Sequence, residues 1–293
     1  MLPFMVGRLV LAGLVVELKI FDRLLPLVKP MARLAHFSPG SGLAFLVAFG
    51  SPIAAEAMIA EFYDEKKIDQ REALIAAIAT WFPLSINTSI IYFLPVLVPM
   101  LGIAGVTYIL LFVLSGMLIT IFMLFAGKIL LTDNSGEFIL DNRKTPFKTA
   151  LKKSINSSMG ILKRILLIAL PASIIAFILM DAGAFGALPG YLDWIPLLPP
   201  ESLGAIAVRF ANEIAGYAMI AGFMESGILD FRGVLLTLLV ADILVSFKYI
   251  FIFILPYYYG LFGHKLGTEI VVISTGLRLV LMVLMISLSL PYL

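Results

Sequence analysis

The sequence contains no cysteine, few charged residues and only two histidines. The lack of cysteine excludes disulfides, iron–sulfur clusters and thiolate zinc sites. His36 and His264 show no metal-ligand spacing, and no Gly-rich loop ending in Lys-Ser or Lys-Thr is present. We therefore expect neither a resident metal nor an organic cofactor, and no ATP hydrolysis by this chain.

Apolar residues make up 61% of the 293 residues and charged residues 14%, with a mean hydropathy of +1.06. Soluble domains are about 25% charged, so a water-soluble globular domain is excluded. No Asp, Glu, Lys or Arg occurs anywhere from Ala73 to Gly127, a run long enough to cross twice when one bilayer crossing needs about 20 residues. The sequence predicts an all-α, multi-pass integral protein of the cell (inner or plasma) membrane, surrounded by the lipid bilayer. Lys and Arg number 21 against 19 Asp and Glu, and we expect no nucleic-acid partner.

The second half of the sequence repeats the first. Residues 44–95 match residues 205–256 without a gap at 17 of 52 positions, where chance would give roughly a tenth. The matches include the string Ala-Met-Ile-Ala at 57–60 and 218–221. We call this gapless superposition the repeat alignment. It predicts a first membrane repeat (1–131), a polar linker with an amphipathic surface helix (132–160) and a second membrane repeat (161–293).

Each repeat is expected to contain a leading helix, an interrupted apolar segment and two long transmembrane helices. The predicted ranges are 3–20, 40–62, 72–95 and 104–131 in the first repeat, and 163–180, 201–223, 233–256 and 266–291 in the second. The interrupted segments break at Gly50-Ser51-Pro52 and at Ala211-Asn212-Glu213. Such a segment either spans once with a kink or folds into a re-entrant hairpin of two short arms.

The placement of Lys and Arg favours the hairpins, because cytoplasmic loops collect positive charge. With two hairpins each repeat crosses three times, the repeats have inverted topology, and nearly all Lys and Arg face the cytoplasm. With two straight spans the repeats are parallel, and a group of basic residues falls outside: Lys19, Arg23, Lys29, Arg33 and Lys265. We also expect a homo-oligomer that uses the leading helices as its contact.

Polar side chains in the apolar segments are candidate site residues, because a charged one costs about 2.5–3.5 kcal/mol in the membrane on insertion scales. Pro83 removes a helical hydrogen bond, and the oxygens that follow predict a site for a coupling cation, Na⁺ or H⁺. This cation site comprises Ser85, Asn87 and Thr88. The predicted substrate contacts are Ser51, Glu56, Asn212, Glu213, Asp242, Ser246 and Lys248.

Structural roles are open alternatives for several of these residues. Arg209 and Glu213 stand four apart on one helix face and could simply neutralise one another, and Arg278 could also be structural. The hydroxyls of Ser85 and Thr88 could bond back to helix carbonyls, as they often do in membrane helices.

At the first break, the string AFGSPIAAEAMIAEFYDEKKIDQREALIAAIATWFPLSINTSIIYFLP resembles the nucleoside-recognition, or gate, domain family. The resemblance covers roughly 44–130 and 205–290. Similar domains occur within concentrative nucleoside transporters, in the membrane part of ferrous-iron permeases and as stand-alone proteins. The resemblance implies paired re-entrant hairpins and partly unwound helices that hold nucleoside and sodium and move in an elevator-like displacement.

By this resemblance, the residues above acquire roles. Gly50, Ser51 and Glu56 would belong to the first hairpin, and Asn212 with Glu213 to the tip of the second. The helix with Ser85, Asn87 and Thr88 would lie beside the sodium site. Two features depart from the family: the first hairpin lacks its Gln-Thr-Glu run, and Ser51 stands where the iron permeases carry cysteine.

The expected function is that of a secondary membrane transporter rather than an enzyme. It would move a small polar, nucleoside-like solute, held between the two tips, at the expense of a cation gradient. One alternative is a non-transporting membrane partner or assembly protein of the gate family, and another is a divalent-cation permease. A third is an intramembrane enzyme acting on lipid, with Glu56 or Asp242 as general acid or base.

Overall fold

The computed structural model describes residues 25–132 and 198–289, together with twelve further positions between 146 and 178. Across these residues the regular structure is helical throughout, so the all-α prediction is confirmed there. The predicted leading helix at 3–20 lies outside the described residues. The predicted leading helix at 163–180 and the predicted surface helix of the 132–160 linker also lie outside the described residues, apart from isolated helical positions.

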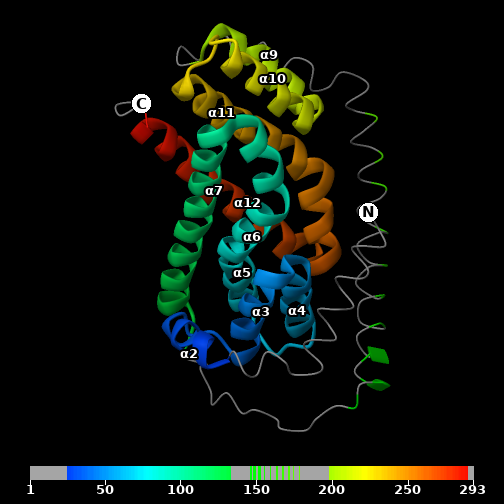
Figure 1. The fold of residues 1–293 in the computed structure, drawn as a ribbon. Helices are drawn as coiled ribbons and strands as arrows, with labels where there is room; N and C mark the ends of the chain where they lie inside the picture. The colour runs from blue at the N-terminus through cyan, green and yellow to red at the C-terminus, as the bar shows by residue number, and fades with distance from the viewer. Residues whose placement is uncertain are drawn as a thin grey trace. The chain divides into compact units, whose positions relative to one another are not determined.

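The helices follow one another without intervening strands in the described ranges (Figure 1). They are α2 (Leu25–Leu34), α3 (Pro39–Gly50), α4 (Pro52–Asp64), α5 (Gln70–Ala79), α6 (Trp81–Thr88), η2 (Ser89–Phe93), α7 (Leu94–Leu130), α9 (Pro200–Ala211), α10 (Glu213–Glu225), α11 (Phe231–Tyr249), η4 (Ile250–Ile254) and α12 (Leu255–Ser289). Of these, η2 and η4 are π-helical turns. In the repeat alignment, the bounds of α9, α10 and η4 coincide with those of α3, α4 and η2.

Two long helical stretches are long and apolar enough to cross a membrane: Gln70–Leu130, of 61 residues, and Phe231–Ser287, of 57 residues. A straight helix of that length would measure about 90 Å, three times the bilayer's hydrocarbon core of about 30 Å. Each stretch is broken at a glycine with positive φ, Gly102 (53°) in α7 and Gly263 (75°) in α12. Glycine adopts this conformation freely because it lacks a Cβ atom. Both glycines lie in the gaps that the sequence predicts between the long helices.

The chain forms two compact units, and each combines segments from both halves of the sequence. Among the described residues, unit 1 contains α2 to α6 as far as Asn87, the end of α7 from Gly116, and Tyr257–Ser274 of α12. Unit 2 contains the start of α7, α9 to α11 and the end of α12. The units therefore do not coincide with the ranges 1–131 and 161–293, because each takes one segment from the other half.

Within unit 1, α3 and α4 lie side by side and run in opposite directions (Figure 1). A Cβ atom on Gly40, at the start of α3, would lie 2.7 Å from the ring of Phe62, near the end of α4. Only glycine therefore allows this close packing. The start of α5 is tied to the same end of α3, because the Glu72 carboxylate accepts hydrogen bonds from Ser38 N and Ser41 Oγ, both at 2.7 Å.

The helix is interrupted at Thr80, between α5 and α6, and Pro83 lies in the first turn of α6. Proline has no N–H to bond the carbonyl four residues earlier, which is that of Ala79. The hydroxyl of Thr120, in the part of α7 that follows Gly102, donates to Ala79 O at 2.7 Å and accepts from Phe82 N at 3.0 Å. The carbonyl that the proline leaves unbonded is thus occupied by the hydroxyl of Thr120.

Replacing Thr120 by valine should destabilise unit 1, because it leaves Ala79 O and Phe82 N buried without partners. We expect a loss of about 1–3 kcal/mol in thermal or denaturant unfolding of the purified protein. Thr107→Val is the matched control, since the Thr107 hydroxyl bonds only to Ile103 O of its own helix. In a Pro83→Ala background the effect of Thr120→Val should shrink, because an alanine there has an N–H that can bond Ala79 O. Equal losses in both backgrounds would contradict this account.

Candidate functional site

The two chain breaks have the same local geometry. Ser51 and Asn212 are both extended, with φ of −150° and −144°. Ser51 Oγ accepts from Ala54 N at 3.4 Å, and Asn212 Oδ1 accepts from Ala215 N at 3.1 Å. Each side chain therefore caps the N-terminus of the helix that follows, α4 or α10. The two residues, both predicted to contact solute, belong to different units, so their predicted convergence on one solute stays a prediction.

Each break also exposes the C-terminal carbonyls of the helix before it, and a polar side chain covers them. In unit 1, Asn87 Nδ2 donates to Phe49 O at 3.3 Å and to Gly50 O at 3.5 Å. In unit 2, Lys248 Nζ donates to Phe210 O. The repeat alignment places Lys248 at the position of Asn87 and Phe210 at that of Phe49. The ends of α3 and α9, which carry partial negative charge, are thus met by a neutral amide in unit 1 and by an ammonium group in unit 2.

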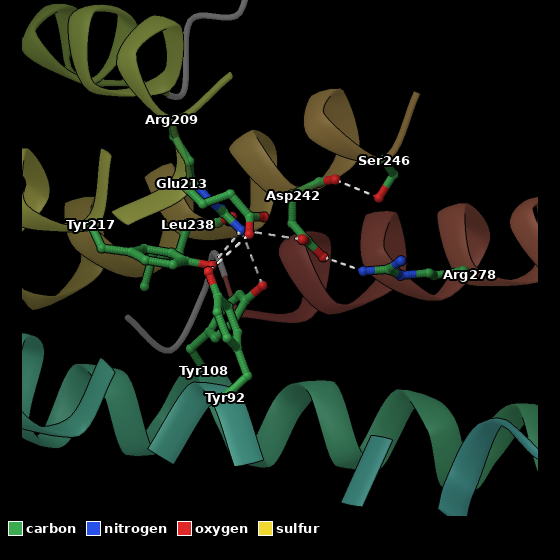
Figure 2. A network of polar contacts seen from close by, with 9 residues as sticks. All are labelled: Tyr92, Tyr108, Arg209, Glu213, Tyr217, Leu238, Asp242, Ser246 and Arg278. Carbon is green, nitrogen blue, oxygen red and sulfur yellow. Dashed lines mark hydrogen bonds and ion pairs between the residues drawn. The ribbon is translucent and has the colours of Figure 1, made fainter. Parts of the chain in front are cut away.

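A network of polar contacts surrounds the buried Arg209 in unit 2 (Figure 2). Arg209 is 0% exposed. Its Nη1 donates to Leu238 O at 2.7 Å, and its Nη2 lies 3.1 Å from Tyr217 OH, 3.5 Å from Tyr108 OH and 3.2 Å from Asp242 Oδ1. The guanidinium group therefore joins α9, α10, α11 and the start of α7.

Asp242 lies between two guanidinium groups. Its Oδ1 pairs with Arg209, and its Oδ2 accepts from Arg278 Nη2 at 2.6 Å. Ser246 Oγ donates to the Asp242 main-chain carbonyl at 2.6 Å. Buried charges are tolerated when they are paired and hydrogen-bonded. The partner of Asp242 is therefore a pair of arginines, and both carboxylate oxygens are already used.

Glu213 lies beside this network but has another partner. The alternative pairing of Arg209 with Glu213, suggested by their spacing, is not what the contacts show: Arg209 pairs with Asp242, and Glu213 Oε2 accepts from Tyr92 OH at 3.1 Å. Glu213 is the first residue of α10, where a carboxylate is stabilised by the helix dipole. It is half-buried, which leaves it more accessible than Asp242.

In unit 1, Glu56 is one of two buried glutamates, the other being Glu72. Glu56 lies on α4, is 5% exposed, and accepts a hydrogen bond from Tyr258 OH of α12 at 2.5 Å. The side chain of Tyr257 also interacts with the Glu56 carboxyl. Glu56, predicted to contact solute, thus meets two tyrosine hydroxyls from the other half of the chain.

The predicted cation ligands have different surroundings. Ser85 Oγ donates to Phe82 O at 2.7 Å, which is the back-bonded alternative that membrane helices often show. Asn87 covers the end of α3, and Thr88 is half-buried. In the described ranges no group of three or more His, Asp or Glu side chains could hold a metal ion.

Tyrosines form much of both networks and were not predicted as site residues. A single tyrosine in an apolar helix looks like any other large buried side chain, so composition and spacing gave no signal. One comparison could have found Tyr217: the repeat alignment places it at the position of Glu56, so the second repeat replaces a buried acid by a buried hydroxyl.

These observations define an all-α protein with two long apolar helices that could span a membrane and with buried charges in its core. No protein-family model and no solved structure matches the chain. The uncharacterized protein MJ0871 of Methanocaldococcus jannaschii is 30% identical over 272 residues, which are 92% of this chain and 85% of that protein. The chain belongs to the same family as MJ0871.

Two further proteins of the same organism are similar over nearly their whole length. The uncharacterized protein MJ1556 is 28% identical over 301 residues, covering 99% of this chain and 93% of that protein. The uncharacterized protein MJ0880 is 27% identical over 296 residues, covering 94% and 93%.

Asp242→Asn should unfold unit 2 more readily, because it removes the carboxylate shared by the buried guanidinium group of Arg209 and the half-buried one of Arg278. We expect a loss of about 3–5 kcal/mol in the free energy of unfolding. Glu213→Gln is the matched control: its amide oxygen can still accept from Tyr92, and the loss should stay near about 0.5–1.5 kcal/mol. Equal losses for the two variants would show that the Arg209–Asp242–Arg278 network does not hold unit 2 together.

Proposed function

We propose that the protein is a secondary membrane transporter of the elevator-like kind, which moves a small polar solute coupled to a cation gradient. The observation that carries this proposal is the buried pair of Arg209 and Asp242, with the half-buried Arg278 bonded to it, on or beside helices apolar enough to span a membrane. Charged groups at membrane depth commonly mark solute or ion pathways. The resemblance of 44–130 and 205–290 to gate domains points in the same direction and suggests a nucleoside-like solute.

Inverted repeats with two re-entrant hairpins are part of the proposal. Support for the hairpins comes from helix length: α3 and α9 have 12 residues and α4 and α10 have 13, or about 18–20 Å at 1.5 Å per residue. A helix of that length covers about two thirds of a 30 Å hydrocarbon core, and α4 returns beside α3. Support for the repeats comes from the helix bounds that coincide in the repeat alignment, and from the segment that each unit takes from the other half of the chain.

The coupling cation is proposed to bind at the end of α3. Two main-chain carbonyls, of Phe49 and Gly50, meet the amide of Asn87 there, and sodium prefers oxygen ligands. The Asn87 side chain needs only to turn over its amide to offer Oδ1 in place of its NH₂ group. Lys248 supports this assignment, because its ammonium group occupies the matching place at the end of α9. Ser85 and Thr88 stay predicted ligands.

The solute contacts are proposed to come mainly from the accessible polar groups. In unit 2 these are Asn212 and Glu213 at the break between α9 and α10, and the buried Lys248, which bonds Phe210 O at the same break, is proposed to join them. Asp242 and Ser246 act indirectly in this proposal, since their oxygens are taken up by arginines and by the helix backbone. Ser51 and Glu56 are the corresponding candidates of unit 1.

A thermal-shift screen of the purified protein with sodium, nucleosides, nucleobases and organic anions tests whether a ligand binds. A ligand present at 100 times its Kd should stabilise the folded state by about 2.7 kcal/mol. Uptake of each stabilising solute into proteoliposomes with and without a sodium gradient then tests transport. Absence of both stabilisation and uptake would refute the carrier and favour a non-transporting membrane partner, whereas turnover of lipid without a gradient would favour the enzyme alternative.

Asn87→Lys tests the cation site by giving unit 1 the lysine that unit 2 has at the corresponding position, Lys248. The new ammonium group should occupy the carbonyls of Phe49 and Gly50, so we expect the variant to fold but to lose the stabilisation by sodium. Lys248→Gln is the control, and its response to sodium should persist because the proposed site is in unit 1. A sodium response retained in Asn87→Lys would place the cation elsewhere.

A further inference from the structure

Glu56 is a buried acid without a basic partner in the described part of the chain. Its carboxyl is enclosed in unit 1, where its neighbours on α4 are buried and apolar: Ala54, Ala55, Ala57, Met58, Ile59 and Ala60. The groups that act on the carboxyl are the hydroxyls of Tyr258 and Tyr257. Asp242 in unit 2 is the contrasting case, because two arginines neutralise it.

The elements packed against α4 supply no compensating positive charge among the described residues. Helix α3 has no titratable side chain. Helix α5 contributes Glu72, which is bonded to Ser38 and Ser41, and Arg71, which is exposed. The segment Tyr257–Ser274 of α12 faces Glu56 with the hydroxyls of Tyr257 and Tyr258, and its basic residues, His264 and Lys265, are exposed.

An ionised carboxylate in such surroundings is costly, and a buried group of this kind becomes neutral instead. A protonated Glu56 fits the geometry. One of its oxygens accepts from Tyr258 OH, and its own O–H has an acceptor available in Tyr257, whose hydroxyl is buried and lacks another hydrogen-bond partner. The Glu56 carboxyl and the hydroxyls of Tyr257 and Tyr258, which have few other hydrogen-bond partners in the described ranges, then bond to one another.

We propose that Glu56, with Tyr258 and Tyr257, is a proton-binding site, and that its proton is carried through the transport cycle. The second half of this statement rests on the proposed carrier function. The carboxylate takes one proton from water when the site is open to one side, and the neutral acid returns it to water on the other side. No other bond is made or broken, and the net change is the movement of one H⁺ beside the cation proposed at Asn87.

Infrared spectroscopy of the whole purified protein tests the proton-binding site directly, without any transport. At neutral pH an exposed glutamate is ionised, so the carbonyl stretch of a protonated carboxyl should reveal a buried neutral acid. We expect this band in the wild type, its loss in Glu56→Gln, and a shift in Tyr258→Phe, which removes one hydrogen bond. Glu72→Gln is the matched control, a second buried glutamate, and should leave the band unchanged.

Glu56→Gln resembles the protonated acid in shape and charge, so the variant should fold with a melting temperature close to that of the wild type. The wild type should lose stability relative to this variant as pH rises, because the unfolded chain releases the proton that the folded chain holds. A Glu56→Gln spectrum identical to the wild type, or a melting difference independent of pH, would overturn the site.

The coupling is tested in proteoliposomes that contain a pH-sensitive dye. With a solute that the wild type takes up, addition of that solute should change the internal pH, and Glu56→Gln should abolish the change. Uptake without any pH change overturns the coupling. A carboxyl band without uptake of any solute supports the proton site and refutes the proposed carrier, whereas uptake without the band refutes the proton site and supports the carrier.

Discussion

The neutralisation of Arg209 is the interaction on which unit 2 depends. A fully buried guanidinium group must find acceptors for its N–H groups and a counter-charge, since leaving it unpaired costs several kcal/mol. The carbonyl of Leu238, the hydroxyls of Tyr108 and Tyr217 and the carboxylate of Asp242 supply these to the two terminal nitrogens, Nη1 and Nη2, whereas the buried Nε has no acceptor among the residues that the structure describes. They come from helices α7, α10 and α11, so the requirements of one side chain fix how these helices pack against α9. The packing is close enough that a Cβ atom on Gly216 would lie 2.2 Å from that of Arg209, which is why α10 has glycine there.

The same principle governs the backbone wherever a helix is interrupted. Water cannot satisfy free N–H and C=O groups in the membrane environment that we propose for these helices, so protein groups are expected to satisfy each break. Ser51 and Asn212 cap the N-terminal ends of the helices that follow them, and Asn87 and Lys248 cover the C-terminal carbonyls before them. Thr120 bridges the break that Pro83 causes. These polar side chains therefore stabilise the helix ends. Only polar groups that make no such hydrogen bond are left to bind a solute.

The sequence predicts where the helices are interrupted, because breaks have local causes. Proline, a Gly-Ser-Pro or Ala-Asn-Glu string and the internal repeat are all visible in one dimension, and Gly102 and Gly263 fall in the predicted gaps. Partner choice has no such local cause. Asp242 stands out as a charge in an apolar helix, but its pairing with Arg209 and Arg278 depends on packing between helices 33 and 36 residues away. The link between Glu56 and Tyr258 spans 202 residues, and spacing along one helix cannot reveal it.

Corresponding positions in the two halves of the chain carry different chemistry. In the repeat alignment, Arg209 and Asp242 stand at the positions of Ala48 and Trp81, whereas Tyr217 stands where Glu56 does in the first half. Continued without a gap beyond its end, the alignment places Arg278 at the position of Met117. A permanently paired charge network stiffens the packing around it, because moving any one helix would expose an uncompensated charge. A single acid that shares hydrogen bonds with two tyrosines carries no such penalty when it is neutral, and it can change its charge when water reaches it. The physical difference between the units is therefore one of reversibility: in unit 2 the charges are fixed by one another, and in unit 1 the charge of Glu56 depends on whether the site is open to water.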